Sequence, residues 1–177
     1  FEKYFSFNDL THKGALIGIR VEGPTNSVDQ RIKRLSKELN LLENEYSVLD
    51  NEQSNIFWKK TKNLEVFSNT EKNLLRVVVP VSETLNFLQK LKNVDLSYFL
   101  DWGGSLIWLE LNDISIKILN EIKDITKNHN GYFTLMKVEE DMKAAADIFT
   151  IDPIKYKISE KIKKSFDPKR IFNPGKM

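Results

Sequence analysis

The residues best suited to ligand chemistry follow a predicted helix, Asp152–Phe166, near the C-terminus. Pro168 cannot continue that helix, because proline lacks a backbone N–H and restricts the residue before it. Asn173 and Gly175 flank a proline in a turn tripeptide, where glycine tolerates positive φ. Together with the ammonium group of Lys176, this loop could reach a ligand or a neighbouring domain. A clamp that only packs the last helix is the simpler interpretation of the same residues.

Two further side chains could recognise a ligand. Arg76 interrupts an apolar strand predicted at Asn73–Val79, and a buried guanidinium needs a carboxylate or backbone partner. We interpret Arg76, like Arg20, as a sheet-edge cation paired with an acid; the alternative is recognition of a ligand carboxylate by the planar fork. Trp102 offers a large apolar surface with one N–H donor. It could contact a ligand or partner, or simply occupy the tip of a hairpin.

Composition limits the remaining chemistry. The chain has 177 residues, a formal net charge of +2 and no cysteine, which excludes disulfides, thiolate catalysis and iron–sulfur ligation. This charge does not require a nucleic acid or a membrane as partner, and no run approaches the ~20 apolar residues of a membrane helix. His12 and His129 are too few for a metal cluster, and we expect His129 to be exposed. The glycines form no phosphate-binding motif.

Hydrophobic periodicity predicts the elements that must position these residues. Alternating apolar residues predict strands at Leu16–Val21, Glu45–Leu49, Asn73–Val79, Val94–Asp101, Ser105–Leu111 and Tyr132–Val138. Helices are predicted to begin at Ser27 with Gln30 as capping partner, at Asp50 with Gln53, and at Ser82, Asp113, Glu139 and Asp152. Gly103 and Gly104 predict a two-residue hairpin turn.

This order of elements predicts an α+β fold. We expect ferredoxin-like βαβ units around a mainly antiparallel sheet, with helices on one face and the other face left for a neighbour. Residues 1–13 show no clear period, and we interpret them as a linker or the remnant of a preceding domain. Residues 14–177 would then form one domain.

Several segments resemble a known family. The segment Phe166–Lys176 is similar to the C-terminus of FAD-linked oxidases of the vanillyl-alcohol-oxidase type. Phe57–Trp58, Leu75–Val77, Asp101–Gly104 and Trp108–Leu109 follow in the same order as in that family. Within it, the chain looks most like the E subunits of bacterial glycolate oxidases.

The resemblance implies a function. Residues 14–177 would be a C-terminal cap domain that covers an FAD bound mainly by a preceding N-terminal domain. The intact subunit would oxidise a small 2-hydroxy acid with a related flavoprotein subunit and an iron–sulfur subunit. That complex would be cytoplasmic, or peripheral at the inner membrane through these partners. The resemblance implies cofactor contacts at Asn173, Gly175, Lys176, Trp102 and Arg76, and this chain alone would be inactive.

One departure from the family and two alternatives remain. Related 2-hydroxy-acid dehydrogenases carry a His-Pro-x-Gly-Asp-Gly-Asn metal-binding segment, whereas this chain has only His129-Asn130-Gly131-Tyr132. We therefore assign no metal site and no catalytic residue. A ferredoxin-like module that binds single-stranded RNA is one alternative, because Gly131-Tyr132-Phe133 weakly matches an RNA-binding sheet motif. A non-catalytic domain for subunit assembly is the other.

Overall fold

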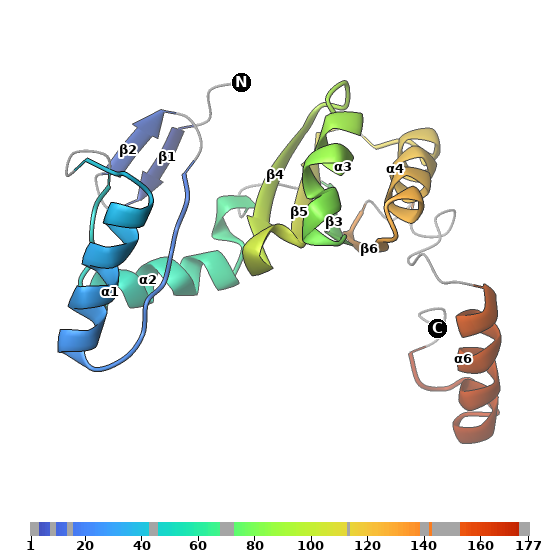
Figure 1. Cartoon of the computed structure of the whole chain (residues 1–177). Coiled ribbons are helices and arrows are strands. Elements are labelled where there is room, and N and C mark those ends of the chain that lie inside the picture. The colour runs from blue at the N-terminus through green and yellow to red at the C-terminus, as the bar shows by residue number, and fades with distance from the viewer. Residues whose placement is uncertain are drawn as a thin grey trace. The chain divides into compact units, whose positions relative to one another are not determined.

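The structure is a computed structural model that describes most of the chain. The described residues are 4–7, 10–13, 16–42, 46–67, 73–112, 114–138, 142 and 153–173. The chain divides into two units, residues 1–68 and 69–177, and each unit is considered by itself (Figure 1). The sequence pattern predicts no boundary near Ser68.

The first unit contains a hairpin and two helices. Strands β1 (Tyr4–Phe7) and β2 (Leu10–Lys13) pair antiparallel, in a region where we expected no regular structure. Residues 16–21, predicted as a strand, pair with no strand, and neither do residues 46–49; Glu45 lies outside the described residues. Alternation of apolar and polar residues indicates an extended chain but does not identify a partner strand. Here the apolar side is not buried, since Ile17 and Ile19 are exposed.

The helices of this unit begin in two different ways. Helix α1 (Thr25–Glu38) follows Pro24, which has a φ of −58° and gives no side-chain cap, so the predicted Ser27–Gln30 capping box is wrong. Helix α2 (Asn51–Lys62) has the predicted capping box. The Gln53 N–H donates to Asp50 Oδ1 at 2.8 Å, and the Asp50 N–H donates to Gln53 Oε1 at 3.1 Å. A 3₁₀ turn, η1 (Glu65–Phe67), follows α2.

The second unit is built on a four-stranded antiparallel sheet. Its strands are β3 (Asn73–Val78), β4 (Leu96–Asp101), β5 (Leu106–Leu111) and β6 (Tyr132–Lys137), in the spatial order β4-β5-β3-β6. The 3₁₀ turn η2 (Val81–Glu83) and helix α3 (Thr84–Lys90) connect β3 to β4, and α4 (Ile116–Asn128) connects β5 to β6. This β-α-β-β-α-β order confirms the predicted α+β, ferredoxin-like fold.

Both connecting helices pack on one face of the sheet, as predicted. Phe87 of α3 and Leu119 and Ile122 of α4 belong to the buried cluster that lies over the sheet. The sheet contributes alternate residues to that cluster: Leu75, Val77, Ile107, Leu109, Leu111, Phe133 and Leu135. Residues between these along each strand therefore point to the opposite face.

Two helix starts in this unit differ from prediction. Ser82 lies inside η2, and α3 begins after it without a side-chain cap. Asp113 lies outside the described residues, and Ser115 caps α4 by accepting the Ile118 N–H at 3.2 Å. In both cases the helix begins later than predicted: a 3₁₀ turn occupies the residues before α3, and Ser115, two residues after Asp113, caps α4.

The last element is α6 (Pro153–Phe166), which ends where predicted (Figure 1). The helix predicted to begin at Glu139 falls almost entirely outside the described residues. Within the described part of the chain, no helix combines the length and the apolar character needed to cross a bilayer.

Candidate ligand-binding face of the sheet

The face of the sheet opposite α3 and α4 carries the candidate residues. The strand register aligns four residues of this face in one row across all four strands: Phe99, Trp108, Arg76 and Thr134. Residues paired in an antiparallel ladder lie on the same face, so these four side chains are neighbours. Phe99, Trp108 and Arg76 are partly exposed, whereas Leu106 and Glu110 on this face are buried.

Arg76 has an unusual environment for a guanidinium. It lies on β3, which is flanked by β5 and β6, and not at a sheet edge. Its Cζ lies 5.3 Å from the centroid of the Trp102 ring. No carboxylate of the described residues pairs with it. Our interpretation of Arg76 as an edge cation paired with an acid is therefore wrong, while Arg20 does pair with Glu22 at 2.6 Å.

The hairpin tip explains how Trp102 reaches Arg76. Asp101 and Leu106 are paired, so four residues form the loop and the predicted two-residue turn is wrong. Trp102, Gly103 and Gly104 have successive φ values of +52°, +63° and +101°. Only glycine adopts such values without a steric cost, so Trp102 is strained.

Two hydrogen bonds hold this strained loop. The Asp101 carboxylate accepts the Trp102 N–H at 2.7 Å. The Thr84 hydroxyl, at the start of α3, donates to the Gly104 carbonyl at 2.7 Å. Neither role was predicted. An aspartate at the start of a turn is a recognised sequence signal, but the contact with Thr84 depends on the fold. The loop is thus fixed at two points.

The C-terminal segment is organised by Asp167. Its carboxylate accepts the N–H groups of Ile171 and Phe172 at 2.9 and 3.0 Å, and the Lys163 ammonium lies 2.7 Å away. The hydrogen bond from Lys163, helped by these two N–H groups, lowers the pKa of Asp167 from 3.8 to about 2. Lys163 also donates to the Phe172 carbonyl. The chain beyond α6 is therefore folded back onto the helix.

Asn173 follows this turn with a φ of +46° and is exposed. Gly175 and Lys176 lie outside the described residues. Among the described residues, no contact joins Asn173 to Arg76 or Trp102. The structure brings Arg76 and Trp102 together, and Asn173, the one C-terminal candidate among the described residues, shares no contact with either.

A contact from α6 reaches the same face of the sheet. Lys155 donates to the Tyr132 hydroxyl at 3.0 Å and its ammonium lies 4.9 Å from the centroid of that ring. Tyr132 pairs with Val78, two residues beyond Arg76 on β3, so it lies on the candidate face.

We expected His129 to be exposed, but the structure shows that it is largely buried. Its imidazole Nδ1 lies 2.8 Å from the Glu83 carboxylate, and only 14% of the His129 side chain is accessible. The ring also meets the buried Phe87 edge to face. It therefore ties α4 to the start of α3. No group of three or more potential metal ligands occurs among the described residues.

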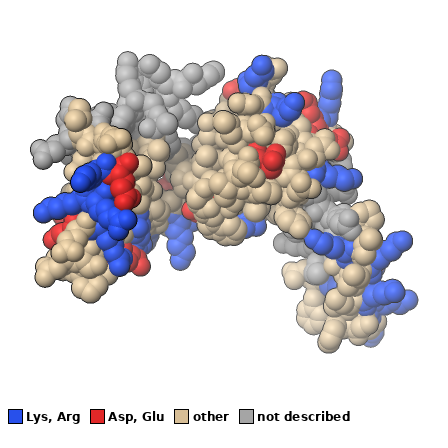
Figure 2. Space-filling view, viewed as in Figure 1, with Lys and Arg blue, Asp and Glu red and all other residues tan. Residues whose placement is uncertain are grey.

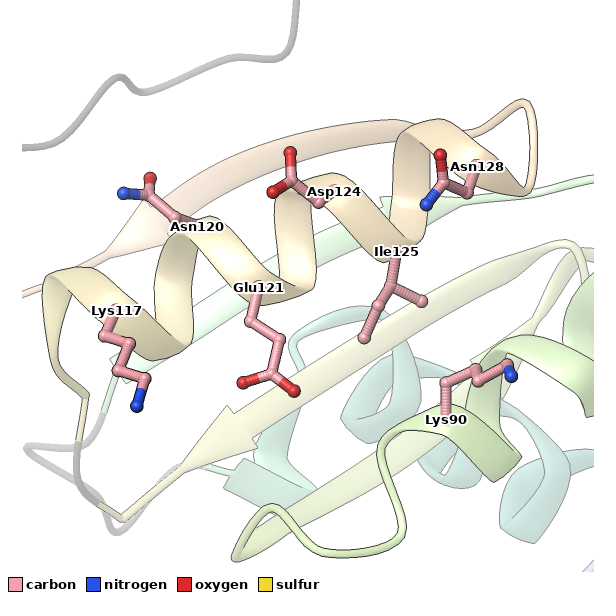
Figure 3. Close-up of a pocket in the computed structure, with 7 residues that line it drawn as sticks. All are labelled: Lys90, Lys117, Asn120, Glu121, Asp124, Ile125 and Asn128. Atoms are coloured by element: carbon pink, nitrogen blue, oxygen red, sulfur yellow. The ribbon is translucent and has the colours of Figure 1, made fainter.

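An open pocket on the outer side of α4 contains none of the candidate residues. It is lined by Lys90, Lys117, Asn120, Glu121, Asp124, Ile125 and Asn128. Figure 3 shows that these side chains do not converge, since Asn120 and Asp124 point away from Lys90 and Glu121. The pocket is lined by both positive and negative side chains that point in different directions, so we assign no ligand to it.

Comparison with protein families gives one match. The family of FAD linked oxidases, C-terminal domain, matches residues 143–177, which include α6 and the segment after it. The match does not extend over the four-stranded sheet. No curated protein matches this chain. The match supports a relation of the C-terminal part of this chain to the FAD linked oxidases.

Proposed function

We propose that this chain is the C-terminal cap half of an FAD-dependent 2-hydroxy-acid oxidase subunit, with glycolate as the substrate. The observation that carries this proposal is a partly exposed Arg76 that lies beside Trp102 on the sheet face opposite α3 and α4 and pairs with no carboxylate of the described residues. The family match over α6 and the following segment supports the flavin assignment. Residues 14–177 are the cap, and the β1–β2 hairpin region, residues 1–13, is a linker or the remnant of the preceding domain.

The residues present suit such a role. FAD, when bound by the preceding domain, supplies the redox chemistry. The planar guanidinium of Arg76 can bind the substrate carboxylate through two parallel hydrogen bonds. The Trp102 ring offers a flat apolar surface toward the cofactor. No residue of this chain is assigned a proton transfer.

The C-terminal segment serves the contact with the flavin-binding domain in this proposal. Asn173, Gly175 and Lys176 offer an amide, a flexible backbone and a cation to the cofactor. The apolar residues of α6 recur every fourth position at Ile154, Ile158, Ile162 and Phe166, and all are more than half exposed. In Figure 2, Lys and Arg side chains project from the part of the molecule that contains α6. An exposed apolar side of this kind fits docking onto another domain.

The cap acts by covering the flavin. Closing the sheet face over the isoalloxazine excludes water and strengthens the pairing of Arg76 with a carboxylate. A related flavoprotein subunit and an iron–sulfur subunit are the proposed partners, in the cytoplasm or at the inner membrane through these partners.

Flavin retention tests the proposal. The chain is produced alone and together with the sequence that its gene encodes upstream. We expect stoichiometric FAD absorbance and bleaching by glycolate only with the upstream segment. Stoichiometric FAD on the chain alone would show that it is not a cap for another domain's flavin. Lack of FAD with a folded upstream segment would remove the flavin assignment itself.

The RNA-binding alternative is weakened by one side chain. In the Gly131-Tyr132-Phe133 motif that suggested RNA binding, Phe133 would have to stack on a base, yet it is only 1% exposed and belongs to the core under α4. Tyr132 does lie on the open face, but Lys155 covers its ring. A gel shift with mixed oligonucleotides at two salt concentrations checks this conclusion, and we expect no shift at either.

A further inference from the structure

The conformation of the hairpin tip determines the contact between Arg76 and Trp102. Trp102 keeps a φ of +52°, a left-handed conformation that is sterically unfavourable for a residue with a Cβ. The Asp101 carboxylate satisfies the Trp102 N–H in that conformation. The Ser105 hydroxyl donates to the Trp102 carbonyl at 3.2 Å. Both backbone polar groups of Trp102 are therefore bound locally.

The loop is also anchored to the helix layer. Thr84 is 7% exposed, and its hydroxyl donates to the Gly104 carbonyl. Asp101 ends β4, whose pairing with β5 fixes the other side of the loop. Trp102 nevertheless remains 59% exposed, so the core does not require its position. Strain retained at an exposed residue points to a role in positioning.

We propose that Trp102 is a positioning residue that orients the Arg76 guanidinium for a carboxylate ligand. The Trp102 ring lies within cation–π distance of the guanidinium and accepts no hydrogen bond from it, so the N–H donors stay available to a ligand. The ring thereby limits the rotations of a long side chain without competing for its hydrogen bonds. A preoriented fork loses less conformational entropy when it binds. This inference rests on the proposed function for the identity of the ligand, but the positioning is measurable without flavin.

The experiment uses NMR of the ¹⁵N-labelled chain, observing the Arg76 Nε–Hε resonance during titration with glycolate. We expect the indole ring current to shift this resonance upfield in the native chain. Trp102→Leu removes that shift and weakens glycolate binding about two- to fivefold, the range for exposed cation–π contacts. Trp102→Phe restores part of both effects, and Arg76→Lys removes the resonance and the bidentate pairing.

Two further variants separate positioning from general damage. Tyr98→Leu removes an exposed aromatic side chain from the opposite face of β4 and should change neither readout. Thr84→Val removes the anchor on Gly104 while Trp102 remains, and should reduce the ring-current shift. Amide spectra of each variant establish that the sheet is folded.

The outcomes distinguish this inference from the proposed function. An Arg76 resonance that is unchanged in folded Trp102→Leu would overturn the positioning role. An upfield shift that depends on Trp102, with no response to glycolate, would support the orientation of the side chain. It would also refute the proposed ligand. A glycolate affinity equal in Trp102→Leu and the native chain would overturn the inference.

Discussion

Replacement of Gly131 by alanine tests how tightly the helix layer closes on the sheet that carries the candidate face. An added Cβ would lie 2.7 Å from the Val78 carbonyl oxygen, 2.7 Å from Val79 Cγ1 and 2.9 Å from Thr126 Cγ2. Real Cβ atoms do not approach other atoms so closely. The Val78 carbonyl belongs to β3, whose pairing with β6 begins beside Gly131, so it cannot move without disturbing the sheet.

The size of the effect follows from these contacts. Overpacking a tight site costs about 1–3 kcal/mol, of which the lower backbone entropy of unfolded alanine offsets about 0.4–1 kcal/mol. For a unit of this size, each kcal/mol lowers Tm by roughly 4–8 °C. Since all three contacts fall below 3 Å, the cost lies in the upper part of that range, about 2–3 kcal/mol, or about 1–2.6 kcal/mol net. We therefore expect Gly131→Ala to lower the Tm of the sheet-containing unit by roughly 4–20 °C, measured by circular dichroism and by calorimetry.

A matched substitution provides the control. At Gly18 in the first unit, an added Cβ would lie 3.1 Å from two atoms of the Phe57 ring, which can rotate away. Gly18→Ala should therefore change stability by less than about 1 kcal/mol. If Gly131→Ala melts at the native temperature, the close packing of Gly131 against β3 is not a real constraint.

Three further predictions concern single polar groups. Because the pKa of Asp167 is lowered, its stabilisation of the C-terminal turn is complete above pH 3.8 and is lost as the pH falls through about 2, which the amide shifts of Ile171 should report. Asn73 Oδ1 is buried without a hydrogen-bond partner among the described residues, so Asn73→Leu should raise the free energy of unfolding by about 1 kcal/mol in a urea titration. Asp50→Ala should destabilise α2 by about 1 kcal/mol, seen as faster amide exchange in its first turn.

Each of these predictions has an outcome that contradicts it. An Asp167→Asn variant should lack the acid transition, and its persistence would assign the transition to another group. A destabilised Asn73→Leu variant would show that the Asn73 amide makes stabilising hydrogen bonds in the folded chain. For Asp50, unchanged exchange in α2 would mean that the helix start is held by packing.

Strand β3 at the centre of the sheet was predictable from the sequence because it buries alternate residues under the helices. Leu75 and Val77 are fully buried between partly exposed neighbours, which is the pattern that periodicity detects. The segment 16–21 shows a similar alternation without pairing, because periodicity describes one chain and says nothing of a partner strand. The β1–β2 hairpin shows the opposite case: its strands pair with each other, but their sequence has no hydrophobic period, so they were not predicted.

The candidate site was predictable only in part. The residue types of Arg76 and Trp102 suggested ligand contacts, but their mutual stacking depends on the strand register and on a loop of four residues. Thr84 contributes through a contact between a helix start and a distant loop, and no local pattern encodes it. Such long-range contacts require the fold.

Two aspartates, Asp101 and Asp167, stabilise the turns that precede candidate ligand-binding residues. Asp101 ends a strand and Asp167 follows a helix, and each carboxylate accepts backbone N–H groups of the turn that comes next. One turn presents Trp102 and the other precedes Asn173. A charged acceptor binds an N–H about twice as strongly as a neutral one, so it can hold a backbone that sterics disfavour. Replacing either aspartate should therefore disturb a neighbouring candidate residue without touching any ligand.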